Sequence, residues 1–184
     1  MRTLGKAIGG KASRIYATGM GPAATYGAEV NGISDAELLR LRRLAGAAMR
    51  PKVQGRSLSM LLLLNRDPTW RANCAPFLQY SKEAWRAWTQ TGHEGCLSLQ
   101  RLRYLWERGV TGKNGFSTLI SPTGKRRWGR VRGPMGAMLL TLHRLGWRME
   151  DAMTVIDDLG VRRKIYDLPK CMGNAMFPCG SSGT

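Results

Sequence analysis

The chain has 184 residues, of which 29 are Lys or Arg and 12 are Asp or Glu, so its formal charge is +17. Its hydrophobic fraction of 43% is ordinary for a globular protein and argues against wholesale disorder. Like charges in one folded body repel, so this excess predicts a densely negative partner, nucleic acid before an anionic membrane surface. A basic protein selected only for solubility is the alternative.

The cysteines and apolar runs exclude several protein classes. Four cysteines are too few for a disulfide-built scaffold, and they form no CxxC pair, so we expect reduced thiols and no structural zinc. The strongest apolar run, 60–64, is far shorter than the ~20 residues that cross a bilayer. We therefore expect an intracellular protein, nuclear or cytoplasmic, without a membrane span. Residues 1–28 carry no acid and resemble a transit peptide in composition, which makes a mitochondrial location the alternative.

The first half of the chain is expected to be helical. Residues 6–18 are compatible with a helix that the Gly and Pro of 19–22 should break. The firmest helix is 35–49, because Ser34 and Glu37 form a capping box before a leucine stripe and Pro51 follows. Further short helices are expected at 57–64 after Ser57, at 81–89 and at 96–108.

The second half changes character at residue 111. Residues 111–133 are punctuated by glycines and carry a run of cations, which predicts a basic loop. Pro134 then opens a helix over 134–145 that Gly146 closes. Residues 153–168 alternate loosely around Asp157-Asp158-Leu159-Gly160 and predict a β-hairpin.

The expected fold is mainly α, a small helical bundle with one β-hairpin near the C-terminus. Four segments are expected along the chain: a helix–turn–helix segment at 1–50, a helical segment at 51–110, the basic loop with a helix and the hairpin at 111–168, and a loose tail at 169–184. The tail has Gly, Ser and Pro and little periodicity, so we expect it to be loose or cut from something longer.

The basic loop is the main candidate for function. Residues 101–150 contain eleven Lys or Arg and two acidic residues, whereas residues 151–184 have no net charge. This uneven distribution predicts one positively charged binding face rather than positive charge spread evenly over the surface. Arginine matches two phosphate oxygens with its planar fork, and a tryptophan can stack on an unpaired base. The alternative is a solvated loop whose tryptophan packs into the core. The expected nucleic-acid-binding residues are Lys113, Lys125, Arg126, Arg127, Trp128, Arg130 and Arg132.

The other tryptophans are expected to be structural. Trp85, Trp88 and Trp106 lie on apolar helical stripes, so core packing is favoured over a stacking platform for bases.

No residue pattern predicts catalysis. Asp157-Asp158 resembles a polymerase carboxylate pair, but no further carboxylate stands in a suitable context and the sequence favours a turn. Neither His93 nor His143 has a spacing to cysteine that indicates a nucleophile–base pair. We therefore expect a protein that is not an enzyme, with no catalytic residues, no metal and no cofactor.

Residues 14–49 resemble a known family. Pro22, Tyr26, Gly27, Glu29 and Val30, followed by a helix with Leu38, Leu41 and Arg42, are similar to the stretch just after the palm in non-LTR (LINE-like) retroelement reverse transcriptases. A weaker similarity covers 128–160, through Trp128, Val131 to Pro134, Leu145 to Trp147 and Asp157 to Gly160. In that family the region is the thumb and connection, which cradles a template–primer duplex by its backbone.

The resemblance implies binding without polymerase activity. The palm's Tyr/Phe-x-Asp-Asp signature is absent from this sequence, and so is an RNase H or endonuclease carboxylate set. The implied partner is the backbone of an RNA or DNA duplex, and an intact turn over 26–30 packed into the core is the implied structure. The alternative is a structural RNA-binding component of an organellar ribonucleoprotein, such as a mitochondrial ribosome.

Overall fold

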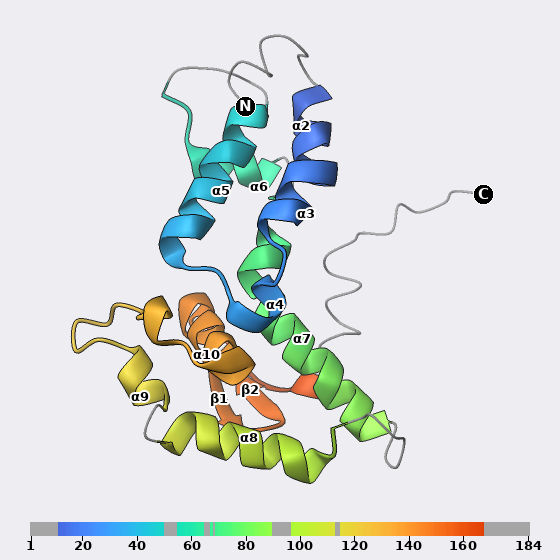
Figure 1. The fold of residues 1–184 in the computed structure, drawn as a ribbon, viewed down its shortest axis with the longest axis vertical. Coiled ribbons are helices and arrows are strands. Elements are labelled where there is room, and N and C mark those ends of the chain that lie inside the picture. Colours follow the sequence, from blue (N-terminus) through green and yellow to red (C-terminus); the bar gives the residue numbers. More distant parts are fainter. Residues whose placement is uncertain are drawn as a thin grey trace. The chain divides into compact units, whose positions relative to one another are not determined.

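The computed structural model describes residues 11–49, 55–64, 67, 69–89, 97–112 and 115–167. It is mainly helical, with a small antiparallel sheet near the C-terminus, which confirms the expected fold class (Figure 1). Lys113, Pro51, His93, every cysteine except Cys74, and the tail 169–184 lie outside the described residues.

The chain divides into two units, Met1–Ala75 and Pro76–Thr184. The boundary falls inside α7 (Trp70–Thr89), at Pro76, which has no backbone N–H to donate to the helix. This differs from the expected segments 1–50, 51–110 and 111–168. The middle segment contributes to both units, because the apolar residues before and after Pro76 pack into different cores.

The N-terminal helix runs further than the sequence predicted. α2 (Lys11–Ile15) passes into a π-helical turn, η1 (Tyr16–Met20), and then into α3 (Gly21–Ala24). The expected break at 19–22 is wrong, because the backbone stays helical there: the π-helical turn, in which the Gly21 amide donates to the Tyr16 carbonyl, leads directly into the turn that contains Pro22. The Tyr16 hydroxyl donates to the Leu41 carbonyl at 3.0 Å and ties this helix to the next.

The predicted capping box begins α5 (Asp35–Ala48), which follows the short α4 (Ala28–Asn31). The Glu37 amide donates to Ser34 Oγ at 3.2 Å, and the Ser34 amide donates back to Glu37 Oε2 at 3.1 Å. The Ser34 hydroxyl also donates to Glu37 Oε2 at 2.7 Å, and this bond, followed by the one from the Ser34 amide, holds the pKa of Glu37 below its usual value. α6 (Leu58–Leu64) begins after Ser57, as expected, and buries Leu61 and Leu62 against α5.

α7 begins at Trp70, well before the predicted start at 81. Asp67 starts it, because its carboxylate accepts from the Thr69 amide at 2.9 Å and its carbonyl accepts from the Trp70 amide. The buried stripe consists of Phe77, Tyr80, Ala84 and Ala87, at helical spacing. Trp85 and Trp88 fall off that stripe and are exposed, so their expected place in the core is wrong.

α8 and α10 match their predictions. α8 (Leu99–Thr111) is capped by Ser98, and it buries Leu102 with Leu99 and Trp106 partly buried beside it. α10 (Gly133–Leu145) has Pro134 in its first turn and is capped at its C-terminal end by Gly146, whose φ of 75° suits glycine. Every residue from Ala137 to Leu142 is buried, which makes α10 the central helix of the second unit.

The hairpin is part of a three-stranded antiparallel sheet, in the order β1-β2-β3. β2 (Thr154–Ile156) pairs with β3 (Arg162–Lys164) as expected, with Val155 opposite Arg163. β1 (Arg148–Asp151) pairs with β2 on the other side and was not predicted. Its side chains are mostly polar and exposed, so no apolar alternation marks it.

Tyr80 links α7 to the turn between β1 and β2. Its hydroxyl is buried and donates to the Ala152 carbonyl at 2.7 Å. Burial, with the nearby Asp151 carboxylate, raises the pKa of Tyr80. We expect Tyr80→Phe to lower the free energy of unfolding of this unit by about 1 kcal/mol, because the buried carbonyl loses its donor.

Urea unfolding followed by tryptophan fluorescence measures this loss, since every tryptophan except Trp70 lies in the second unit. The control is Tyr104→Phe, which removes the hydroxyl of an exposed tyrosine on α8. Equal stability of wild type and Tyr80→Phe would contradict the assigned role of this hydrogen bond.

Candidate nucleic-acid interface

The basic loop is an ordered hairpin rather than an irregular connection. It follows the short helix α9 (Phe116–Leu119) and runs into a 3-10 turn, η2 (Trp128–Arg130). We call residues 119–132 the basic hairpin. In Figure 1 it projects from the second unit next to α9 and α10.

A four-residue turn makes the basic hairpin tight. The Gly124 amide donates to the Ser121 carbonyl at 2.8 Å, and the Ser121 amide donates to the Lys125 carbonyl at 2.8 Å. Gly124 has φ 74°, so this turn needs a residue that tolerates the left-handed region. Ile120 and Arg126 then form a β-bridge, and the Arg127 amide donates to the Leu119 carbonyl at 2.8 Å. Proline at the second turn position and glycine at the fourth are the sequence signal that could have predicted it.

The two ends of the basic hairpin are fixed on α10. A Cβ built on Gly136 would lie 3.5 Å from Leu119 Cδ1 and 3.6 Å from Val131 Cγ1, so both ends pack against one spot of the helix. Leu119 is buried, whereas Lys125, Arg130 and Arg132 are exposed. The cations are therefore displayed from a backbone that is anchored on both sides.

Trp128 has a structural role that the sequence left open. The Arg144 guanidinium lies over its ring, with Cζ 4.7 Å from the centroid. The Trp128 Nε1 atom is buried and has no hydrogen-bond partner in the described part of the chain. One face of the indole is thus covered by Arg144. Arg144 itself was not predicted, because the contact joins residues distant in sequence.

The cations of the basic hairpin differ from those of β3 in their partners. Arg162 pairs with Glu150 at 2.7 Å, and Arg163 pairs with Asp157 at 2.8 Å. Within the described residues, no carboxylate lies in ion-pair distance of the side chains of Lys125, Arg127, Arg130 and Arg132.

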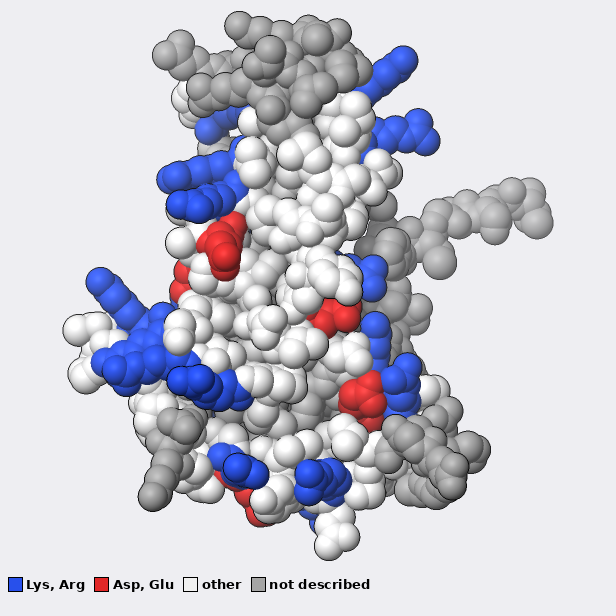
Figure 2. Space-filling model, viewed as in Figure 1, with Lys and Arg blue, Asp and Glu red and all other residues white. Residues whose placement is uncertain are grey.

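The sequence explains this difference, because no acidic residue lies between Glu107 and Glu150. Figure 2 shows Lys and Arg grouped where the basic hairpin projects. Six of the seven predicted binding residues lie in this structured segment, from Lys125 to Arg132. The seventh, Lys113, is outside the described residues.

Asp157 and Asp158 form the predicted turn. Asp157 is buried, and its Oδ1 accepts from the amides of Leu159 and Val161, at 3.0 and 2.8 Å. Its Oδ2 accepts from Arg163 Nε at 2.8 Å, and these bonds, the one from Arg163 first, hold the pKa of Asp157 below its usual value. Asp158 accepts from Trp147 Nε1 at 3.2 Å. The Asp157 carboxylate therefore holds the turn between β2 and β3, and that of Asp158 ties this turn to Trp147, just before β1.

The remaining titratable candidates are not grouped. His143 lies on α10 against the ring of Phe116, with centroids 5.9 Å apart, and Cys74 is buried in α7. In the ranges that the structure describes, no three His, Cys, Asp or Glu side chains are grouped to hold a metal ion. No described helix is both long enough and apolar enough to cross a membrane.

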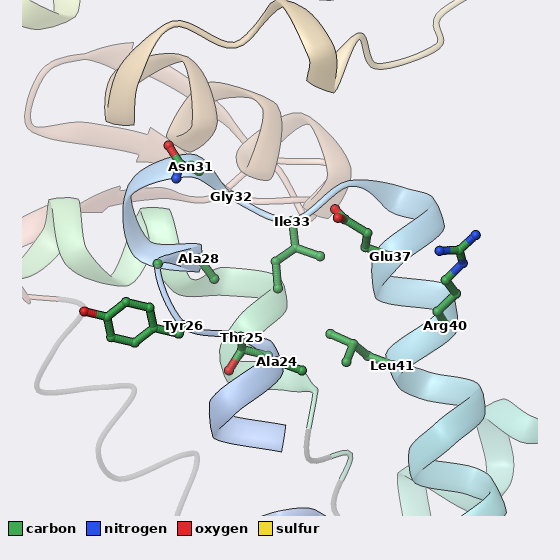
Figure 3. Close-up of a pocket in the computed structure, with 11 residues that line it drawn as sticks. Ala24, Thr25, Tyr26, Ala28, Asn31, Gly32, Ile33, Glu37, Arg40 and Leu41 are labelled. Carbon is green, nitrogen blue, oxygen red and sulfur yellow. The ribbon is translucent and has the colours of Figure 1, made fainter. Parts of the chain in front are cut away.

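The first unit contains a pocket of about 340 Å³ at the turn that carries the family resemblance. Figure 3 shows Ile33 and Leu41 pointing into it and Tyr26 pointing away. Glu37, the carboxylate among the described lining residues, accepts hydrogen bonds from Ser34 in the capping box. The described lining is mixed, with Thr25, Asn31 and Arg40 beside Ile33 and Leu41.

The turn over 26–30 forms, but it does not pack as the resemblance implies. Tyr26 is 95% exposed and Val30 is 50% exposed. Leu38 and Leu41 are buried, and Arg42 pairs with Asp67 at 3.4 Å. The helix part of the motif is thus structural, and the packing of its tyrosine lends the resemblance no support.

Comparison with known proteins adds no relative: no family model, no curated protein and no solved structure matches this chain.

Asp157 allows a test of the turn by pH. Asn at this position keeps an oxygen for the two amides but cannot accept from Arg163, so we expect Asp157→Asn to be less stable at pH 7. The folded pKa lies below the unfolded value of about 3.9, so the carboxylate's stabilisation is complete above that pH. It is lost as the pH falls through the folded pKa.

Thermal unfolding at pH 7, 5, 3 and 2 measures this effect. The melting temperature of Asp157→Asn should lie below that of wild type at pH 7, and the difference should become smaller as the pH falls. Asp158→Asn is the matched control, because that side chain is exposed and an amide oxygen can still accept from Trp147. If the difference in melting temperature is the same at pH 2 and pH 7, the ionised carboxylate of Asp157 does not stabilise the turn.

Proposed function

We propose that this chain binds the sugar–phosphate backbone of nucleic acid without reading base sequence, and that the basic hairpin is its contact surface. The observation that supports this is the set of cations at Lys125, Arg127, Arg130 and Arg132, which lack carboxylate partners among the described residues. Phosphates that meet such cations release condensed counterions, which is the main source of non-specific affinity. Cations already neutralised by carboxylates, as on β3, contribute less to this binding.

The anchoring of the basic hairpin favours binding to a regular backbone. Arginine side chains on an ordered backbone lose less conformational entropy when they bind phosphate than arginine side chains on a disordered backbone. In this proposal Trp128, under Arg144, supports the hairpin rather than stacking on a base. No catalytic step is part of the proposed function.

The nature of the nucleic acid separates two versions of the proposal. The resemblance to the thumb and connection of a non-LTR retroelement reverse transcriptase implies a duplex of template and primer. A structural component of an organellar ribonucleoprotein, such as a mitochondrial ribosome, would instead prefer RNA with unpaired segments. A salt titration against a duplex and against unpaired RNA of equal length distinguishes them.

We expect a variant with Ala at Arg126, Arg127, Arg130 and Arg132 to bind more weakly to all sequences alike. Each phosphate contact contributes ~0.9 to the slope of log K against log salt for duplex DNA, so the slope should flatten by up to ~3.6. Fluorescence anisotropy between ~50 and ~200 mM salt measures both affinity and slope.

The matched control loses the same charge elsewhere. Ala at Arg40, Arg43, Arg86 and Arg162 removes two exposed arginines of α5 and two that pair with Glu83 and Glu150. The control should keep most of the salt slope. If the salt slope falls equally in both variants, binding depends on net charge and not on the basic hairpin. If the wild-type protein binds neither duplex nor unpaired RNA, the proposed function is wrong.

A further inference from the structure

A second hollow, of about 370 Å³, lies in the second unit, away from the turn of the basic hairpin. It is formed by the end of α7, one side of α8, the turn between β1 and β2, and η3 (Ile165–Asp167). Three aromatic side chains line it: Trp88, Trp106 and Tyr166. The proposed contacts to phosphate do not use any of them.

Trp88 and Tyr166 form a parallel stack at its wall. Their ring centroids are 4.6 Å apart and the rings are 3° from parallel, although Trp88 is 53% exposed. An exposed indole held flat by a second ring has already lost its rotamer freedom, so a further ring can add to it at low entropic cost. This differs from Trp85, which is also exposed on α7 but does not line the hollow.

Trp106 adds a third ring to this aromatic lining. Its Nε1 atom is buried and has no acceptor within the residues that the structure describes. A rotation of the indole would bring this unpaired N–H to an acceptor atom of a bound ring. Ring nitrogens and carbonyl oxygens of the nucleobases are acceptors of this kind.

The charges around the hollow balance. The lining contains two cations, Arg103 and Lys164, and two carboxylates, Glu107 and Asp151. Asp151 already accepts from the Met153 amide at 2.6 Å, and Lys164 donates to Thr154 Oγ1 at 3.0 Å. A lining with equal numbers of cations and anions attracts neither a phosphate nor a cation strongly, in contrast to the basic hairpin. It suits an uncharged planar ring.

We propose that this hollow, lined by Trp88, Trp106 and Tyr166, takes an unpaired nucleobase from the strand whose backbone contacts the basic hairpin. The inference rests on the proposed function and deepens it, because it adds a contact to bases where the hairpin contacts only phosphates. It implies a preference for strands with unpaired segments over a fully paired duplex.

The test compares two single strands with equal phosphate charge, a twelve-nucleotide oligodeoxyadenylate and the same strand with abasic sites throughout. At ~150 mM salt we expect the full-length protein to bind the strand with bases about tenfold more tightly, which is within the range for one stacked base. Trp88→Ala should lower that affinity to the abasic level and leave abasic binding unchanged. Trp88→Phe, which keeps a ring, should retain most of the preference.

The control variant is Trp85→Ala, which removes an exposed indole from the same helix and should change neither affinity. Equal binding of the two strands by wild type, or equal losses in Trp85→Ala and Trp88→Ala, would overturn the base pocket and leave the backbone contact standing. If wild type binds neither strand, both the pocket and the proposed function fail.

Discussion

The second unit depends on the burial of α10 from Ala137 to Leu142. This helix contacts α8, α9 and β1, and its apolar side chains meet Phe77 and Leu102 in one core. The basic hairpin returns to the same helix at both ends, near Gly136, and the Arg144 side chain lies over Trp128. The backbone that carries the exposed cations is therefore anchored on a helix whose middle, from Ala137 to Leu142, is buried.

The distribution of acids decides which cations remain available. On β3 the arginines find Glu150 and Asp157, because the strand pairing brings those carboxylates to neighbouring positions. Between Glu107 and Glu150 the chain offers no acid at all, so cations there have no carboxylate neighbour in sequence. Leaving them solvated avoids the high cost of burying unpaired charge, and a polyanion can then approach.

The two aromatic arrangements have different consequences. Trp128 is covered by a guanidinium and stabilises the basic hairpin, whereas Trp88 is exposed and stacked on Tyr166. The same residue type thus packs against a cation in one place and against a second ring in the other. Separate contacts to phosphate and to base within one unit would let affinity follow strand charge, while unpaired bases add a modest preference.

The sequence by itself determined the local elements with strong signals. The capping box at Ser34, the Pro134 and Gly146 limits of α10, and the Asp157–Gly160 turn all depend on residues within a few positions of each other. Only the tertiary structure decided β1, the exposure of Trp88, the cover of Trp128 by Arg144 and the division at Pro76. β1 pairs with its sequence neighbour β2 but lacks apolar alternation, and the other three depend on contacts between residues far apart in the chain, which neither apolar periodicity nor capping patterns record.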